Sequence, residues 1–192
     1  KRDWSSDVCS SDLFAVARLP EVGEPVATRT TLAEILSISA EDILGGTTAP
    51  QAVSCGLPFV IVGVKSLKAL GRARVKYDRW EETMGKASSR DLFVFCPDAE
   101  RGPQQYRARC FVPGQGVPED PATGSANVAF AGFLAARAPE RDGTLKWSVR
   151  QGVEMGRPSL IEIEADKSGG AITGVRVAGN ATFVMSGSIS LG

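Results

Sequence analysis

The chain of 192 residues is long enough for one domain or two small ones with a hydrophobic core, and too short for a long multidomain enzyme. It carries 22 basic and 22 acidic residues, so no net charge favours binding to nucleic acid or to an anionic membrane. Histidine is absent, which excludes Ser-His-Asp and Cys-His catalysis and every zinc site that needs a histidine ligand.

Apolar runs and cysteine usage indicate the compartment. The longest apolar stretch, at residues 57–64, is far shorter than the roughly 20 residues of a membrane-spanning helix. The four cysteines are widely spaced, form no CxxC pair and follow no apolar signal peptide. We therefore expect a soluble, cytoplasmic protein in which Cys55 and Cys110 are core thiols rather than nucleophiles.

The first 13 residues, KRDWSSDVCSSDL, show neither helical nor strand periodicity and contain SSD twice. Residues 3–13 also resemble the translation of a common sequencing-library adaptor. We therefore predict that residues 1–13 are a non-native leader that does not belong to the fold. This interpretation implies that the natural protein starts upstream of Phe14 and that its front portion is absent from the sequence.

Short helices and strands are expected in the first third of the remaining chain. Residues 14–19 favour a short strand. TLAEIL at 31–36 and SAEDILGG at 39–46 each place an acidic residue three positions after a Thr or Ser, a capping-box pattern that predicts two short helices. β-Branched residues at 52–56 and 57–64 predict two buried strands, or one strand kinked between them.

The basic stretch from Lys65 to Lys76 contains five basic residues and no acidic one. It is compatible with a phosphate-binding patch, but a solvated helix face is favoured because the whole chain is neutral and no aromatic residues interleave. The next two segments, 91–97 and 105–111, are separated by a polar loop with Gly and Pro, which predicts a hairpin.

The last third predicts one buried helix followed by strands. Residues 126–138 are apolar or small on nearly every helical face, which is typical of a helix in the centre of a fold. Apolar and polar residues alternate at 159–166 and 174–179, and two glycines supply a turn between these strands. Residues 181–192 favour one more strand or pair. The predicted fold class is α+β, a curved, mostly antiparallel sheet wrapped around a central buried helix.

The turn before the buried helix carries the most concentrated chemistry in the sequence. It brings the carboxylate of Asp120 to the helix N-terminus, where free N–H groups and the helix dipole favour an anion. Gly124 allows a ligand to approach the backbone closely, and Thr123 and Ser125 supply hydroxyls. A carboxylate next to an anion site suggests proton transfer on a small acid.

Ordinary structural interpretations of the same residues stay open. Asp before Pro often opens a turn, and Thr or Ser before an apolar helix is a common N-cap. GxG at 114–116 lacks the third glycine of the dinucleotide fingerprint, and the pattern GxxxxGK[ST] does not occur. We expect no cofactor and no metal.

Three segments carry a family resemblance. RCFVPGQGVPEDPATGSANVAFAGFL at 109–134 closely resembles the signature of the PhzF-like isomerases of phenazine biosynthesis, whose fold is that of diaminopimelate epimerase. QGVEMGRPSLIEIE at 151–164 resembles a later motif of the same family, and VSCGLPFVIV at 53–62 resembles an earlier one. The resemblance implies two pseudo-symmetric halves, each a curved sheet around a central helix, with the active site in the cleft between them.

The resemblance also implies roles for individual residues. Asp120 matches the family's active-site aspartate, and Gly124 and Ser125 match the residues that hold the substrate carboxylate. Ser54 corresponds loosely to a substrate-contacting position of the related epimerases. The family's principal acid/base, a glutamate in a Ser-Glu-Thr-type motif, and a histidine in a Cys-Gly-His motif have no counterpart in the sequence.

Domain boundaries follow from the same resemblance. We expect residues 14–22 to end a missing N-terminal domain, residues 23–182 to form a C-terminal PhzF-like domain, and residues 183–192 to form a last strand that returns to the N-terminal domain. The expected partner is a small carboxylic acid, not nucleic acid or a membrane, and a homodimer is left open.

The predicted function is that of a cofactor-independent isomerase that moves a proton between carbons of a small carboxylic acid. Asp120 would assist proton transfer, while Thr123, Gly124 and Ser125 would bind the substrate carboxylate. This chain is expected to be the C-terminal part of that enzyme and inactive by itself. The alternative is a non-catalytic small-acid binder or an inactive truncated protein of the same fold, because a helix N-terminus binds an anion whether or not chemistry follows.

Overall fold

The computed structural model describes residues 12–180 and 185–188, which contain ten strands and four α-helices. The strands are β1 Asp12–Ala15, β2 Glu21–Val22, β3 Gln51–Ser54, β4 Pro58–Gly63, β5 Asp91–Pro97, β6 Gln105–Val112, β7 Val117–Asp120, β8 Gly143–Gln151, β9 Ser159–Ser168 and β10 Ala171–Gly179. The helices are α1 Arg29–Leu36, α2 Leu67–Arg72, α3 Tyr77–Met84 and α4 Gly124–Ala135, with 3₁₀ turns η1 Ala40–Asp42, η2 Gly46–Thr48, η3 Pro113–Gln115 and η4 Val153–Met155.

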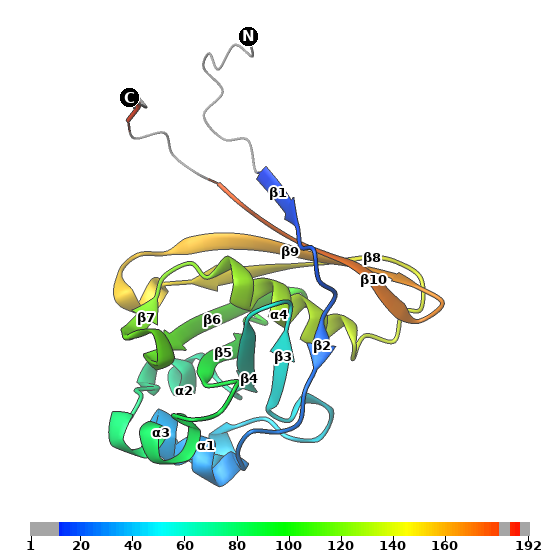
Figure 1. The fold of residues 1–192 in the computed structure, drawn as a ribbon. Coiled ribbons are helices and arrows are strands. Elements are labelled where there is room, and N and C mark those ends of the chain that lie inside the picture. Colours follow the sequence, from blue (N-terminus) through cyan, green and yellow to red (C-terminus); the bar gives the residue numbers. More distant parts are fainter. Residues whose placement is uncertain (1–11, 181–184, 189–192) are drawn as a thin grey trace.

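All ten strands form one sheet in the order β1-β10-β9-β8-β6-β5-β4-β3-β2, with β7 paired to β6. Seven of the nine strand pairings are antiparallel, and the parallel ones are β4 with β5 and β6 with β8. The sheet curls around α4, whereas α1, α2 and α3 lie on the other side of its lower half (Figure 1). The predicted α+β architecture, a mostly antiparallel sheet around one buried helix, is confirmed.

Helix α4 fills the concave side of the sheet. Nine of its twelve residues are buried, which explains why the sequence is apolar on every face of this helix. Phe130 of α4 packs against Phe93 and Phe95 of β5, with ring centroids 5.2 and 4.6 Å apart. Gly132 lets the segment between β1 and β2 cross the helix, since a Cβ there would lie 2.4 Å from the Pro20 side chain.

A second core lies on the outer side of β4, β5 and β6. There α1, α2 and α3 cover strand residues such as Val62 and Val94, which are 0% exposed. These strands therefore have both faces buried, in agreement with their continuous apolar sequences. The five basic residues of 65–76 are exposed as expected, but only Lys68 and Arg72 lie on α2, so they do not form one helix face. The described residues contain no helix long and apolar enough to cross a membrane.

The predicted helices at 31–46 are only partly correct. Helix α1 begins at Arg29 because Thr28, not Thr31, is the N-cap: Oγ1 of Thr28 accepts the N–H of Thr31 at 3.2 Å. The second predicted helix is the single 3₁₀ turn η1. The hydroxyl of Ser39 forms no cap there because it donates to the side chain of Glu41.

The first strand differs from the prediction in its bounds, and most of the last predicted strand lies outside the described residues. The strand expected at 14–19 is β1, which begins at Asp12 and pairs with β10 from Gly179 to Arg176. The sheet thus includes the last two residues of the predicted leader, and residues 1–11 lie outside the described part. Most of the strand expected within 181–192 also lies outside the described residues, and 185–188 form no strand.

Candidate functional site at the N-terminus of α4

The junction between β7 and α4 brings the predicted site residues together. Asp120 is the last residue of β7 and pairs with Cys110 of β6. Thr123 is the N-cap residue of α4, which begins at Gly124. Asp120 and Thr123 are half-buried, whereas Gly124 and Ser125 are exposed. The structure therefore places a carboxylate at the exposed N-terminus of an otherwise buried helix.

Asp120 belongs to a network of hydrogen bonds. Oγ1 of Thr123 donates to its Oδ2 at 2.6 Å. Gln151, the last residue of β8, donates from Nε2 to the Asp120 carbonyl oxygen at 2.7 Å and to Oγ1 of Thr123 at 2.9 Å. Its Oε1 accepts the N–H of Thr123 at 3.3 Å and Nδ2 of Asn127 at 2.8 Å. Gln151 and Asn127 are 0% exposed, so the hydrogen bond between their amides is shielded from water.

This network leaves α4 without a side-chain cap. The hydroxyl of Thr123 is turned to Asp120 and Gln151, so it is not the acceptor for the first-turn N–H groups that an N-cap threonine usually provides. Those N–H groups carry the positive end of the helix dipole at exposed positions Gly124 and Ser125. The hydroxyl that the sequence analysis assigned to a substrate carboxylate is therefore used within the protein, while the N–H groups are not.

A buried arginine anchors the strand that carries Asp120. Nε and Nη2 of Arg109 donate to the two carboxylate oxygens of Glu119 at 2.9 and 2.7 Å. Nη1 donates to the carbonyl oxygens of Leu70 and Ala73, at the end of α2, at 3.1 and 2.8 Å. Arg109 is 3% exposed. This fork holds β7 in register directly before Asp120 and ties it to the outer helix layer.

Gly152 allows the segment after β8 to approach the site. Its φ is +76°, a conformation that favours glycine. A Cβ at this position would lie 2.8 Å from the carbonyl oxygen of Pro121 and 2.3 Å from that of Arg157. The pair Gln151–Gly152 thus places an amide in hydrogen-bond contact with the site and a backbone without a side chain against the turn after Asp120.

The cysteine and serine predictions have different outcomes. Burial raises the pKa of Cys110 to about 12, so the thiol behaves as a core group. Burial likewise raises the pKa of the half-buried Cys55 to about 11. Ser54 ends β3, and its hydroxyl accepts the N–H of Gly56 in the following turn. No hydrogen bond among the described residues joins Ser54 to the Asp120 network.

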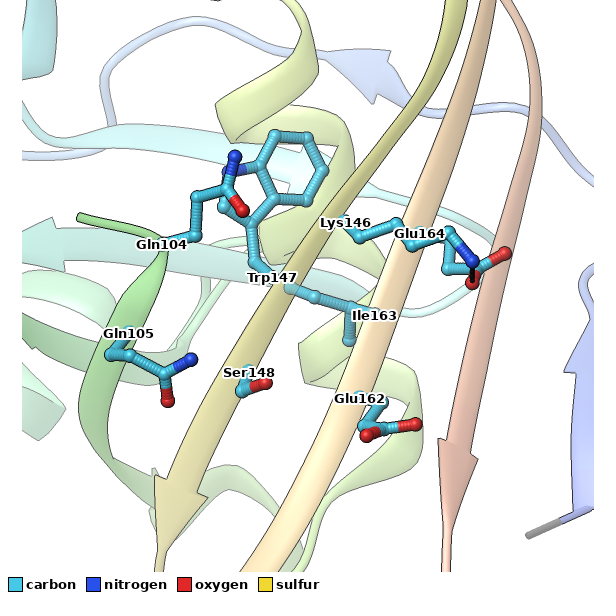
Figure 2. Close-up of a pocket in the computed structure, with 8 residues that line it drawn as sticks. All are labelled: Gln104, Gln105, Lys146, Trp147, Ser148, Glu162, Ile163 and Glu164. Atoms are coloured by element: carbon cyan, nitrogen blue, oxygen red, sulfur yellow. Dashed lines mark ion pairs between the residues drawn. The ribbon is translucent and has the colours of Figure 1, made fainter. Parts of the chain in front are cut away.

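The structure also contains a pocket of 320 Å³ away from this junction, where β8 continues beyond its pairing with β6 (Figure 2). The residues that line it are Gln104, Gln105, Lys146, Trp147, Ser148, Glu162, Ile163 and Glu164. Nζ of Lys146 lies 2.6 Å from Oε1 of Glu164, so the pocket's lysine is already paired. None of the predicted site residues lines this pocket. Across the described ranges, no group of three His, Cys, Asp or Glu residues is arranged to hold a metal ion.

Comparison with known proteins places the chain in a family. The family of phenazine biosynthesis-like proteins, PhzC-PhzF, matches residues 5–187. The chain belongs to this family. The PhzC-PhzF match contains the turn, the helix and the Gln151–Gly152 pair described above.

Curated relatives and a solved structure agree with this assignment. The chain is 32% identical over 179 residues to a protein of Mesorhizobium japonicum named an uncharacterized isomerase, covering 92% of this chain and 59% of the relative. It is 32% identical over 169 residues to the trans-2,3-dihydro-3-hydroxyanthranilate isomerase of Pseudomonas chlororaphis, covering 88% and 58%. A crystal structure of a PhzF-family phenazine biosynthesis protein from Bacillus anthracis superposes with a TM-score of 0.78 at 19% identity, covering 90% and 58%. The chain thus spans less than two thirds of each.

Sequence reasoning found the turn and the helix but missed the two buried amides. Asn127 reads as one polar residue within an apolar helix, and Gln151 was used only as part of a family motif. The available signal was the combination of a polar residue inside an apolar helix with a Gln-Gly pair after a strand. The pairing of Ala108 in β6 with Gln151 in β8, which brings the amide to Asp120, is a long-range feature.

Proposed function

We propose that the protein to which this chain belongs is an isomerase that moves a proton between carbons of a small carboxylic acid, without a cofactor. Family membership and the isomerase names of two relatives support this reaction class. The observation that carries the proposal is the uncapped N-terminus of α4 beside a carboxylate, because it offers an anion site and a proton-transfer group within one turn of chain.

In the proposed reaction the exposed N–H groups at Gly124 and Ser125 bind the substrate carboxylate, and the Ser125 hydroxyl adds a further donor. Asp120 lies beside the bound acid, with Oδ2 held by Thr123, and assists the proton transfer at carbon. Thr123 contributes by orienting Asp120, and Ser54 takes no part in this step. The remaining acid/base group is expected from outside this chain.

Deuterium incorporation tests the reaction and the role of Asp120 together. The enzyme encoded by the whole reading frame is incubated with trans-2,3-dihydro-3-hydroxyanthranilate in D₂O, and incorporation at carbon is followed by mass spectrometry. Asp120→Asn is expected to slow incorporation by about 100-fold or more, because an amide cannot exchange the proton. The control is Asp78→Asn, which removes an exposed carboxylate on α3.

Each outcome of this experiment decides a point. Unchanged incorporation in Asp120→Asn contradicts the proton-transfer role of Asp120. Binding of the acid without any incorporation in the unaltered protein favours the small-acid binder. The 192-residue chain is assayed in parallel, and we propose that it does not support incorporation by itself.

A further inference from the structure

The hydrogen bonds around Asp120 run in one direction. The carbonyl oxygens of Asp120 and Thr123 can only accept, and the N–H of Thr123 can only donate, so they fix which end of each buried amide faces which neighbour. Nδ2 of Asn127 therefore donates to Oε1 of Gln151, and Nε2 of Gln151 donates to Oγ1 of Thr123. With that acceptor position filled, the Thr123 hydroxyl points its proton at Oδ2 of Asp120.

The direction of this chain explains why Thr123 does not cap α4. A threonine at the N-cap normally accepts an N–H from the second or third helical residue, here Ser125 or Ala126. Gln151 donates to the Thr123 hydroxyl and accepts the Thr123 N–H, and together with Asp120 it holds the hydroxyl in an orientation that makes no cap. The helix therefore gives up a cap and keeps its first-turn N–H groups free.

The arrangement is held at a cost in hydrogen bonding. Asn127 uses both N–H bonds of its amide on the Thr123 carbonyl oxygen and on Gln151. Its Oδ1 is buried and has no hydrogen-bond partner within the described residues. A buried polar atom without a partner is unfavourable and is retained where the other end of the group has a task. The task visible here is to fix the orientation of Gln151.

We propose that Gln151 is a positioning residue, which holds the Thr123 hydroxyl on Asp120 and so keeps the N-terminus of α4 open for a carboxylate. This inference rests on the proposed function for the identity of the ligand, but not for the behaviour of Thr123. This proposal gives both residues of the Gln151–Gly152 pair a role. Gln151 keeps the Thr123 hydroxyl from capping α4. Gly152 lets the chain approach Pro121 closely enough for the Gln151 amide to contact Thr123.

The main test is a pair of variants in the 192-residue chain with anthranilate as the probe. In Gln151→Met the Thr123 hydroxyl is free to cap α4, and the affinity for anthranilate is expected to fall about fivefold, the equivalent of one cap. Adding Thr123→Val removes the hydroxyl and with it the cap. The double variant Gln151→Met/Thr123→Val is therefore expected to regain most of the lost affinity.

A second measurement needs no ligand. Amide hydrogen exchange at Ser125 and Ala126 reports directly whether a cap has formed, because a capped N–H exchanges more slowly. We expect slowing by about fivefold at one of these two amides in Gln151→Met and none in the double variant. If Gln151→Met does not fold, Gln151→Glu replaces it, since an ionised glutamate keeps the acceptor for Asn127 and loses the donor to Thr123.

The outcomes separate this inference from the proposed function. Equal exchange rates in the unaltered chain and the Gln151 variants overturn the positioning role. A loss of affinity for anthranilate that Thr123→Val does not restore also overturns it, because such a loss would come from a general destabilisation of the site and not from a cap. Slower exchange in Gln151→Met together with no anthranilate binding to any variant supports the positioning role and contradicts the carboxylate site.

Discussion

The outer side of the sheet has two regions with opposite chemistry. Over β4, β5 and β6 it is covered by α1, α2 and α3 and packed with apolar side chains. Over β8, β9 and β10 no helix of the described residues covers it, as Figure 1 shows. The strands there carry the charged side chains of Lys146, Glu164, Asp166 and Arg176. Both regions share α4 on their inner side. The comparison isolates what a helix layer adds to the same sheet.

Each region contains one arginine that binds carboxylates on its sheet. Arg109 lies under the helix layer with its side chain 3% exposed and pairs with Glu119. Arg176 lies on the uncovered side with its side chain 23% exposed and pairs with Glu164 and Asp166. The N–O distances of the Arg109 and Arg176 ion pairs are similar. We therefore expect the two arginines to differ in their contribution to stability because they differ in exposure to solvent. Removing one partner of a buried pair leaves a desolvated charge, whereas an exposed pair exchanges its partner for water.

The largest expected effect is the loss of Arg109. Arg109→Met leaves the Glu119 carboxylate and the two carbonyl oxygens at the end of α2 without their donor, and should lower the free energy of unfolding by about 3–5 kcal/mol. Urea denaturation followed by circular dichroism measures it.

The matched control for this substitution is Arg72→Met. Arg72 pairs with Asp42 on the surface, its side chain is 53% exposed, and its loss should cost at most about 1 kcal/mol. If the free energy of unfolding falls by the same amount in both variants, the helix layer does not desolvate the Arg109–Glu119 pair. Burial would then not explain a difference between the ion pairs of the two regions.

The same substitution placed on each region tests apolar packing. Leu70 of α2 is 0% exposed, and Leu70→Ala should cost about 2–5 kcal/mol because it leaves a cavity. Leu160 of β9 is 51% exposed on the uncovered side, and Leu160→Ala should change the free energy of unfolding by less than about 0.5 kcal/mol. Thermal and urea denaturation of both variants measure the difference. A cost at Leu160 close to that at Leu70 would mean that another surface covers the uncovered side.

The two regions are visible in the sequence as two patterns. FVIV in β4 and LFVFC in β5 are continuously apolar, which indicates that both faces of these strands are buried. In SLIEIEAD of β9 apolar and polar residues alternate, which indicates that one face is exposed to solvent. The all-round apolar sequence of α4 likewise predicted its central place. These elements could be predicted because the positions of apolar residues in their sequences match the faces that the fold buries.

The rest of the fold and site depended on long-range register. β8 was not predicted although Leu145, Trp147 and Val149 alternate with polar residues, and a shift of one residue in its pairing would turn Gln151 away from Asp120. Nothing local distinguishes the buried Arg109 from an exposed arginine on a strand. The turn that carries Asp120 could be found from sequence, but the amides that orient it could not.

The effect expected for Arg176 is small, and it depends on salt and pH. Hydrogen bonds lower the pKa of Asp166 from 3.8 to about 2. The bond from Arg176 has the largest effect, and the bond from Thr144 has the next largest. A carboxyl whose pKa is lower in the folded state stabilises the fold above its unfolded pKa, and this contribution is lost as the pH falls from about 4 to about 2. Arg176→Ala should therefore cost about 0.2–1 kcal/mol at neutral pH and low salt.

Urea denaturation of the unaltered chain and Arg176→Ala at neutral pH and near pH 2 would show whether this side of the sheet behaves as a surface. The difference between the two proteins should fall to a small remainder near pH 2, where Asp166 is about half protonated in the unaltered chain and protonated in Arg176→Ala. It should also shrink in about 1 M NaCl at neutral pH because exposed pairs are screened. Lys68→Ala, on the exposed face of α2, controls for the loss of a positive charge. A difference that persists near pH 2 and in salt would show that Arg176 is held by burial, as Arg109 is.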